Sequence, residues 1–525
     1  MLRYILEKKP LLFCIWSAFA FRMVAVFFSQ GIAFGYEHYV YVENSQMLLS
    51  GDITLTELLT SENQSFADHG YSLLYLLLNW LILQTGELFG IFDPQSKMFI
   101  IRLVHALASL LSVYYSYRIA RTFSSRKVGL AVGLAISMLW FEPYMSVRNF
   151  AECVSSILLL AGFYRIAKYK QLTFKYADDL FTGFLMGLGT SISYSSGIFV
   201  IGVFISFIIR ENLKRALYFL LGSLISLFAF EGLVDIIFFN QPFYSIIEYC
   251  KSILTGHLSS SGPSCYYMYF SILLLVFLFP WGIAAIFAFF RSWKKYFMLF
   301  FPVFFYIIAH YIIPYKQERF MLNILPFYII LTIAGWNNYY NHSKFWTIHK
   351  KLYNTLILSF IIINMLLMII TATAFTRKSQ VETMLYLSRN RSEITSILVD
   401  DCENSSSKTF PPFYFGGKII QYTLNKQEKE PDKSIISSYI NNYPNIRELY
   451  SEKYFENIPD SLYPQYILFY GDYKLEQRVE KIKTIFNTIT YQQTITPSIS
   501  DRIIQYFNKK NRNMPVYIYK VGLEN

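Results

Sequence analysis

Long apolar runs recur from the N-terminus to about residue 375 and limit what this chain can fold into. An α-helix needs about 20 mostly apolar residues to cross the hydrocarbon core of a bilayer. By this measure we expect spanning helices at 11–30, 99–120, 128–146, 149–167, 180–194, 196–210, 215–239, 267–290, 296–313, 321–337 and 353–374. The pattern predicts an α-helical polytopic membrane protein with about 11 transmembrane helices.

The composition supports this interpretation. Of the 525 residues, 54% are hydrophobic and 16% are charged, whereas a soluble globular chain carries about 25% charged residues. The formal net charge of +12 would suit nucleic-acid binding, but the basic residues are spread through short loops between the apolar runs. This spread is typical of the positive-inside rule, by which Lys and Arg collect in cytoplasmic loops. We therefore expect membrane lipid, and no nucleic acid, among the partners.

The basic loops also orient the expected helices. If the N-terminus is cytoplasmic, about 11 crossings bring one set of basic loops to the same side: 118–127, 168–175, 210–215, 291–295 and 344–351. A shorter apolar segment at 71–83 would break this alternation if it crossed the membrane. Short apolar runs favour re-entrant or interfacial helices, and we expect one here.

The sequence becomes polar after the last apolar run. Residues 1–376 form the expected transmembrane module, and its first non-cytoplasmic loop spans 31–70. Residues 377–525 contain strand-like pieces at 466–471 and 516–521 beside helix-like stretches. This length suits a small mixed α/β domain. Because the expected number of crossings is odd, this soluble C-terminal domain is predicted on the lumenal or periplasmic side.

A charged cluster interrupts the apolar sequence at HYIIPYKQERFMLNILPF, which contains Lys316, Glu318 and Arg319. The predicted topology places this cluster on the non-cytoplasmic side, where positive charge is unexpected. Arg grips phosphate through its bidentate fork and Lys acts as a point charge, while Glu318 could orient Arg319. The alternative is an external loop with a local salt bridge. We favour an anionic lipid headgroup, because the tight flanking spans press the basic pair against the interface.

The first external loop carries a candidate general base. Glu37 and His38 follow the first expected span directly, in the stretch GYEHY. Partial burial at the mouth of a membrane cavity can raise the pKa of a carboxyl group toward the working pH. A solvated loop carboxylate is the simpler interpretation of an isolated Glu, so both interpretations stay open.

Two further regions hold candidate substrate-binding residues. FEPYMSVRNFAE contains Arg148 and Glu152, which form either an ion pair with each other or part of a substrate site. The region 231–270 contains Asp235 and an aromatic group that includes Tyr267 and Tyr269. Aromatic residues at a membrane interface are mostly belt residues, although they could equally stack on sugar rings.

In this order the segments resemble glycosyltransferase family 22, the multi-spanning mannosyltransferases that build GPI anchors and lipid-linked oligosaccharides. YKQERFMLNILPF is similar to the family's HKEERF-x-x-P-x-x-P segment, with Tyr315 in place of His and Gln317 in place of Glu. GYEHY is similar to its P-D-E-Y/F motif, with Glu37 at the position of the proposed catalytic Asp and His38 at that of the Glu.

The remaining motifs extend the resemblance over about residues 10–375. HGYSLLYLLL is similar to R-G-Y-x-x-P-L, with His69 in place of Arg, and SVRNFAECVSS is similar to R-x-x-S/A-E. VDIIFFNQPF and GPSCYYMYF are similar to VDS-x-x-Y-G and G-T-H-P-W-x-W-Y-F, and they keep Asp235 and Tyr269. His69 joins the expected substrate-binding residues on the strength of this resemblance.

The resemblance implies a GT-C fold and a polyprenyl-phosphate sugar donor, typically dolichyl-phosphate mannose, with a glycolipid or glycan as acceptor. In our hypothesis Glu37 deprotonates an acceptor hydroxyl, which displaces the lipid phosphate with inversion at the anomeric carbon. Lys316 and Arg319 hold the departing phosphate. Because these cations take the Lewis-acid role, we expect no metal or other cofactor. The membrane is that of the endoplasmic reticulum in a eukaryote and the inner membrane in a bacterium.

Two alternatives stay open at this point. A transporter or flippase of lipid-linked sugars also uses intramembrane charges and broken helices. A catalytically lapsed scaffold would account for the changes at positions 38, 69, 315 and 317. We favour the transferase, because a transporter should carry its ionisable residues near the midpoints of its spans, and here they cluster at external loop ends.

Overall fold

A computed structural model provides the fold. It describes residues 8–60, 71–169, 176–255, 267–402, 409–424, 436–437, 446–449, 455, 463–486, 488–507 and 513–522. The chain divides into two compact units. The first unit comprises residues 1–29, 65–78 and 101–373, and the second comprises residues 30–64, 79–100 and 374–525.

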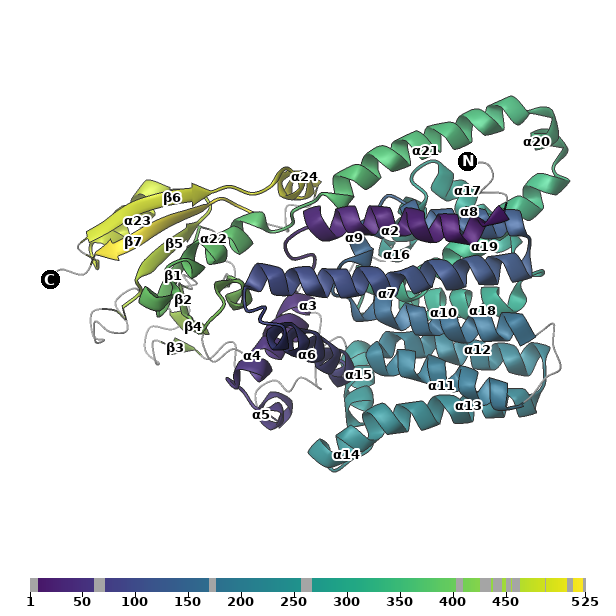
Figure 1. Cartoon of the computed structure of the whole chain (residues 1–525), viewed down its shortest axis with the longest axis horizontal. Coiled ribbons are helices and arrows are strands. Elements are labelled where there is room, and N and C mark those ends of the chain that lie inside the picture. The colour runs from purple at the N-terminus through teal and green to yellow at the C-terminus, as the bar shows by residue number, and fades with distance from the viewer. Residues whose placement is uncertain are drawn as a thin grey trace. The chain divides into compact units, whose positions relative to one another are not determined.

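Apolar helices make up the first unit, and Figure 1 shows most of them side by side. In chain order its helices are α2 (Pro10–Phe28), α7 (Pro94–Phe123), α8 (Arg126–Met138), α9 (Glu142–Ser146), α10 (Ala151–Tyr169), α11 (Tyr176–Ile192), η2 (Tyr194–Ser196), α12 (Gly197–Arg210), α13 (Leu213–Leu227), η3 (Phe228–Gly232), α14 (Leu233–Phe239), α15 (Tyr244–Thr255), α16 (Met268–Val276), α17 (Trp281–Arg291), α18 (Phe297–Ile312), η4 (Glu318–Asn323), α19 (Leu325–His342), α20 (Lys344–Ile348) and α21 (Lys350–Ala372). Helix α6 (Leu73–Leu88), like α7, has residues in both units.

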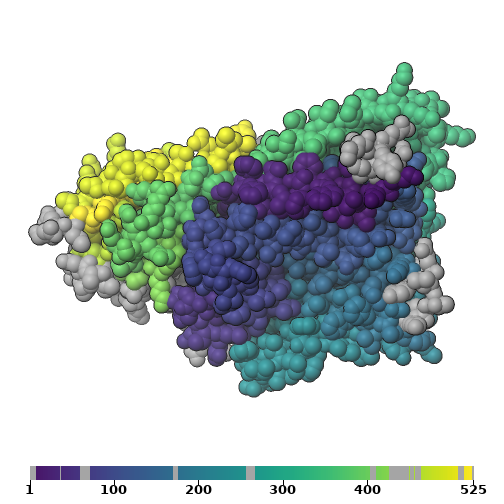
Figure 2. Space-filling model, in the orientation of Figure 1, coloured from purple at the N-terminus to yellow at the C-terminus, as the bar shows by residue number. Residues whose placement is uncertain are grey.

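Several helices are suited to a membrane. Within the described residues, four continuous helical stretches are long and apolar enough to cross one: Pro10–Phe28, Pro94–Phe123, Leu213–Phe239 and Lys350–Ala372. The outer face of α2 leaves Trp16, Phe27 and Phe28 more than half exposed, and Figure 2 shows this helix on the molecular surface. Exposed aromatic rings on an apolar helix suit contact with lipid chains. The number of crossings stays a prediction.

Two expected spans are broken. The range 267–290 forms α16 and α17, which bend by 101°. The range 128–146 forms α8 and α9, and the Asn364 side chain of α21 bonds both chain ends at this break. Its Oδ1 accepts the Trp140 N–H at 2.9 Å and its Nδ2 donates to the Met138 carbonyl at 2.7 Å. A backbone break at membrane depth is tolerated when neighbouring side chains satisfy the freed groups, so the uninterrupted span expected at 128–146 was wrong.

Glycines let α11 and α13 pack closely. A Cβ atom on Gly183 would lie 1.9 Å from the Phe219 carbonyl oxygen, and one on Gly222 would lie 1.9 Å from that of Leu180. Small residues at helix crossings allow this backbone contact in membrane proteins.

We expect Gly222→Ala to lower the thermal unfolding temperature of the protein in detergent, because the added methyl group must push α13 off α11. Overpacking of this kind typically costs about 1–3 kcal/mol. Leu217→Ala on α13 is the control, since the Leu217 side chain is half exposed. An unchanged unfolding temperature for Gly222→Ala would show that the two backbones are not in contact.

The second unit contains short helices and a sheet. Its elements are α3 (Gly35–Glu37), η1 (His38–Glu43), α4 (Asn44–Ser50), α5 (Leu55–Thr60), α22 (Lys378–Ser388), η5 (Arg391–Glu393), β1 (Ser396–Asp401), η6 (Pro412–Phe415), β2 (Ile420–Leu424), β3 (Ile436–Ser437), β4 (Ile446–Leu449), β5 (Tyr466–Tyr470), α23 (Leu475–Lys483), β6 (Thr488–Ile495), α24 (Ile499–Phe507) and β7 (Val516–Gly522). The compact unit thus includes residues of the expected first external loop together with the C-terminal region.

The strand order of the described sheet is β3-β4-β2-β1-β5-β7-β6. Strands β4, β2, β1 and β5 pair in parallel, whereas β7 pairs antiparallel with both β5 and β6. The strand-like pieces predicted at 466–471 and 516–521 are β5 and β7, and the predicted mixed α/β character of this region is confirmed. The central strands β1 and β5 are buried along their whole length, as expected for parallel strands covered on both faces.

Candidate functional site

The charged segment between α18 and α19 is a short, largely buried connector. Helix α18 ends at Ile312, the turn η4 follows from Glu318, and α19 begins at Leu325 with Pro326 in its first turn, where a missing N–H is tolerated. Lys316 is only 6% exposed, and its ammonium group donates to the Ile313 carbonyl at 2.7 Å. Burial lowers the pKa of Lys316.

Arg319 is paired with a carboxylate from another helix. Its Nε lies 3.6 Å from Oε1 of Glu152 on α10, and the two side chains are 10% and 4% exposed. Its guanidinium also lies over the Tyr71 ring, 5.7 Å from the centroid, and donates to the Gln317 side chain. Glu318, which we expected to orient Arg319, is exposed. Glu152 is the carboxylate that pairs with Arg319, and a part for Glu318 in the phosphate site stays a prediction.

Arg148 and Glu152 do not form an ion pair with each other, and a substrate role for both stays a prediction. The Arg148 guanidinium donates to the Ser29 hydroxyl at 2.9 Å and lies over the Tyr144 ring, 4.4 Å from its centroid. Glu152, four residues on, reaches the Arg319 side chain. Sequence spacing suggested Arg148 and Glu152 as partners, but the ion pair to Arg319 joins segments far apart in the chain, and no local pattern carries that information.

The two candidate tyrosines lie in different environments. Tyr269 is 1% exposed, and its hydroxyl accepts a hydrogen bond from the backbone N–H of Gln317 at 3.2 Å. Tyr269 therefore packs against the segment that carries Lys316 and Arg319. Tyr267 is 68% exposed. Asp235 accepts both the backbone N–H and the hydroxyl of Ser245, at 3.0 and 2.7 Å. These contacts hold the corner between α14 and α15, and a substrate role for Asp235 stays a prediction.

A hydroxyl-rich cluster beside the connector was missed by sequence reasoning. The Asn323 amide donates to the Ser195 hydroxyl at 2.8 Å, and the Tyr306 hydroxyl donates to the Phe320 carbonyl at 2.7 Å. Nearby, the Tyr194 hydroxyl donates to the buried Glu231 carboxylate at 3.0 Å. The Ser-rich break SISYSSG between α11 and α12 was the available signal, because interrupted helices often line cavities.

The candidate base belongs to the second unit. Glu37 ends α3 and is 4% exposed, while His38 begins η1 and is 5% exposed. The simpler interpretation of Glu37 as a solvated loop carboxylate was therefore wrong. His69 lies outside the described residues.

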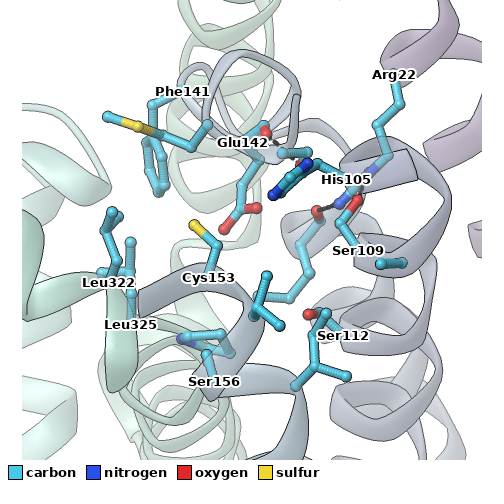
Figure 3. A pocket seen from close by; sticks show the side chains of 17 residues that line it. Arg22, His105, Ser109, Ser112, Phe141, Glu142, Cys153, Ser156, Leu322 and Leu325 are labelled. Carbon is cyan, nitrogen blue, oxygen red and sulfur yellow. Dashed lines mark hydrogen bonds between the residues drawn. The ribbon is translucent and has the colours of Figure 1, made fainter. Parts of the chain in front are cut away.

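A small cavity lies in the first unit, lined on one side by Cys153 and Ser156 of α10 and on another by Leu322 and Leu325. Its volume is about 50 Å³. A cavity needs on the order of 10–15 Å³ of such free volume to hold one water molecule. This cavity therefore suits a few water molecules and is too small for a sugar ring. Figure 3 shows the Glu142 carboxyl group pointing into it near the Cys153 thiol.

Arg22 brings a buried charge to this cavity. It is 1% exposed, its Nε donates to the Ser109 hydroxyl at 2.7 Å, and its Nη2 donates to the Ile136 carbonyl at 3.2 Å. These acceptors are neutral, and the Glu142 carboxylate is close enough to interact electrostatically with the guanidinium. A buried charge needs such a counter-charge.

We expect Arg22→Met to destabilise the protein by about 1–3 kcal/mol, because the buried Ser109 hydroxyl and Ile136 carbonyl lose their donor and Glu142 loses a nearby positive charge. The double variant Arg22→Met/Glu142→Gln should recover the part of that loss that comes from the charge on Glu142. Thermal unfolding in detergent measures both, with Arg126→Met at the exposed start of α8 as control. Equal destabilisation by the single and double variants would exclude a charge pair across the cavity.

The fold of this chain is that of the GT-C glycosyltransferases, as the solved structures similar to it indicate. One is ArnT from Cupriavidus metallidurans in the apo state, with 11% identity, a TM-score of 0.62, and coverage of 98% of this chain and 99% of that chain. The same protein bound to undecaprenyl phosphate gives a TM-score of 0.59 with the same identity and coverage. The oligosaccharyltransferase AglB from Archaeoglobus fulgidus, in complex with an inhibitory peptide and a dolichol-phosphate, has 10% identity and a TM-score of 0.50, covering 89% of this chain and 70% of that chain.

Sequence comparison then supplies the family. The profile of the Alg9-like mannosyltransferase family matches residues 13–403, and the chain belongs to this family. No curated protein sequence matches the chain. The resemblance to glycosyltransferase family 22 is therefore confirmed, and the protein is a multi-pass membrane glycosyltransferase.

Proposed function

We propose that this protein transfers mannose from a polyprenyl-phosphate donor to a glycolipid or glycan acceptor at the non-cytoplasmic face of its membrane. The observation that carries the proposal is the basic pair on one connector between apolar helices: Lys316 is buried, and Arg319, whose side chain is 10% exposed, is paired with Glu152. ArnT binds undecaprenyl phosphate and AglB binds a dolichol-phosphate, which supports a lipid phosphate as the ligand. The membrane is that of the endoplasmic reticulum or the bacterial inner membrane.

In the proposed mechanism, Glu37 accepts the proton of an acceptor hydroxyl. The hydroxyl oxygen attacks the anomeric carbon of the donor sugar, and the bond from this carbon to the phosphate oxygen breaks with inversion. The leaving lipid phosphate keeps the electron pair of that bond, and Lys316 and Arg319 stabilise its developing charge. Fixed cations in a water-poor site act strongly on such charge without having to reorganise. Glu152 keeps the Arg319 fork in place before the donor arrives.

A transporter of lipid-linked sugars is the competing class. Arg22 and His105, which line the cavity from α2 and α7, are ionisable groups inside expected spans and would suit it. The cavity volume of about 50 Å³ suits water rather than a sugar, and we favour the transferase. Proteoliposomes that move a labelled polyprenyl-phosphate sugar across the bilayer without transferring it would favour the transporter.

Phosphate recognition tests the proposal directly. The purified protein should bind a polyprenyl phosphate more tightly than the matching polyprenol in detergent, as measured by native mass spectrometry. We expect Arg319→Gln and Lys316→Gln each to weaken phosphate binding by roughly 10- to 100-fold, the range for a lost hydrogen bond to a charged group. Polyprenol binding should be unchanged in both variants. Equal affinity of the wild-type protein for the two lipids would overturn the proposal.

A further inference from the structure

His38 and Glu43, five residues apart, meet because the backbone between them is a π-helix. In an α-helix, residues five positions apart lie about 140° from each other around the axis, so their side chains face different neighbours. Residues His38–Glu43 form η1, a π-helix, whose i→i+5 hydrogen bonds bring such residues to successive turns on one side. His38 Nε2 lies 3.3 Å from Glu43 Oε1, and the two side chains are 5% and 4% exposed.

The C-terminal region supplies the partner of this buried pair. The backbone N–H of Phe413 donates to both carboxylate oxygens of Glu43, at 2.9 and 2.8 Å. Phe413 lies in the turn η6, directly after Pro411 and Pro412. Proline has no N–H, and the next N–H, that of Tyr414, is bonded within the turn to the Pro411 carbonyl. The Phe413 N–H is thus the first donor that this turn can offer to another segment.

Aromatic contacts extend the same junction. The His38 ring is stacked on the Tyr414 ring, with centroids 5.6 Å apart and planes inclined by 13°, and the Phe413 ring meets it edge-on at 5.9 Å. The next residue, Tyr39, donates from its hydroxyl to the Thr409 carbonyl at 3.2 Å. Consecutive residues of η1 therefore rest on one short stretch of the C-terminal region, 409–416.

The residues that precede Glu37 also contact the C-terminal region, at Thr376 and Arg377. The backbone of Ile32 donates to the Thr376 carbonyl at 3.2 Å, and Thr376 donates in turn to the Gln30 carbonyl at 3.1 Å. A Cβ atom on Gly35 would lie 2.7 Å from Nη1 of Arg377, so the guanidinium packs directly on the backbone two residues before Glu37. Both flanks of Glu37 are thus fixed by residues beyond the last apolar helix.

We propose that the segment 409–416 is a positioning element for the catalytic loop, in which Glu43, Phe413 and Tyr414 lock the π-helix that begins directly after Glu37. This inference rests on the proposed function, in which Glu37 is the base. It assigns a task to a stretch of the C-terminal region that lies beyond the family match at residues 13–403. Glu43 and Tyr414 act through the backbone of η1 and touch no reacting atom.

Kinetics of the full-length protein, with a radiolabelled polyprenyl-phosphate mannose as donor, test the inference. Glu43→Gln weakens the bonds from Phe413, and Tyr414→Ala removes the stacked ring. We expect each to lower kcat by at least about tenfold, with KM for the donor and binding of polyprenyl phosphate within about twofold of the wild type. The double variant should lose little more than either single variant, since residues that act as a unit are not additive. Tyr414→Phe keeps the ring and should restore kcat, and Tyr473→Ala, at an exposed site of the same unit, is the matched control.

Hydrogen exchange gives a readout that needs no activity. The backbone amides of residues 37–43 should exchange faster in Glu43→Gln and Tyr414→Ala than in the wild type, and Tyr473→Ala should leave them unchanged. Unchanged exchange in both variants would overturn the inference, as would a lower unfolding temperature with normal kcat. If Glu37→Gln abolishes transfer while Glu43→Gln does not reduce it, the inference alone fails. If transfer survives Glu37→Gln, the proposed role of Glu37 fails and the positioning role fails with it.

Discussion

Glu37→Gln is expected to lower the rate of sugar transfer by about 10²- to 10⁴-fold, the usual contribution of a general base. Gln has nearly the same shape as Glu but cannot accept the acceptor proton, so the loss should appear in kcat. The buried position of Glu37, 4% exposed at the end of α3, suits a group that is shielded from bulk water. Initial rates of mannose transfer from a radiolabelled polyprenyl-phosphate donor in membranes measure the effect.

Glu476→Gln provides the control for this substitution, because Glu476 is exposed on α23 of the same unit. It should transfer at the wild-type rate. Binding of polyprenyl phosphate by Glu37→Gln should also match that of the wild type, since the proposed mechanism assigns phosphate binding to Lys316 and Arg319. Full transfer activity of Glu37→Gln at wild-type expression would show that another group, or none, takes the proton.

Arg319→Met is expected to reduce both activity and stability. Losing a cation that stabilises the leaving phosphate should cost about 10²- to 10³-fold in kcat, as for removal of one preformed charge-stabilising donor. The same change leaves the buried Glu152 carboxylate without its partner, and removal of one member of a buried pair typically costs about 3–5 kcal/mol. Transfer rates and thermal unfolding in detergent measure the two losses separately.

The double variant Arg319→Met/Glu152→Gln separates the two roles of Arg319. With both charges gone, most of the stability should return, because no charge is left buried alone. Transfer should stay low, because the phosphate still lacks its cation. Recovery of transfer together with stability would mean that Arg319 only supports the fold. Arg502→Met, at an exposed position of α24, controls for the loss of a positive charge in general.

Hydrophobic length and charge predicted much of the fold. The apolar runs located most of the long helices of the first unit, among them α2, α7, α10 and α21, because a span requires about 20 apolar residues and short loops end it. The breaks were harder to predict. The interruption after Met138 depends on Asn364, which lies far along the chain and satisfies the freed backbone groups on both sides of the gap. An apolar run carries no sign of that partner.

The candidate site was predicted in part for a similar reason. Positive charge is unexpected on the predicted non-cytoplasmic side, and this pointed to Lys316 and Arg319. In the structure Lys316 is buried and Arg319 is paired with Glu152. The partner of Arg319, Glu152, lies on another helix, and sequence spacing offered only Arg148 as an ion-pair partner for Glu152. His38 and Glu43 are on different faces of any α-helix, and only the π-helical winding of η1 brings them together. Local propensity does not predict such a winding.

Transfer by the purified wild-type protein tests the central claim most directly. The protein, reconstituted with a mannose-terminated glycolipid acceptor, is offered radiolabelled mannose either on dolichyl phosphate or on a nucleoside diphosphate. We predict that label reaches the acceptor from the lipid phosphate alone, with inverted anomeric configuration in the product. Transfer from the nucleotide sugar, with none from any polyprenyl-phosphate donor, would contradict the account.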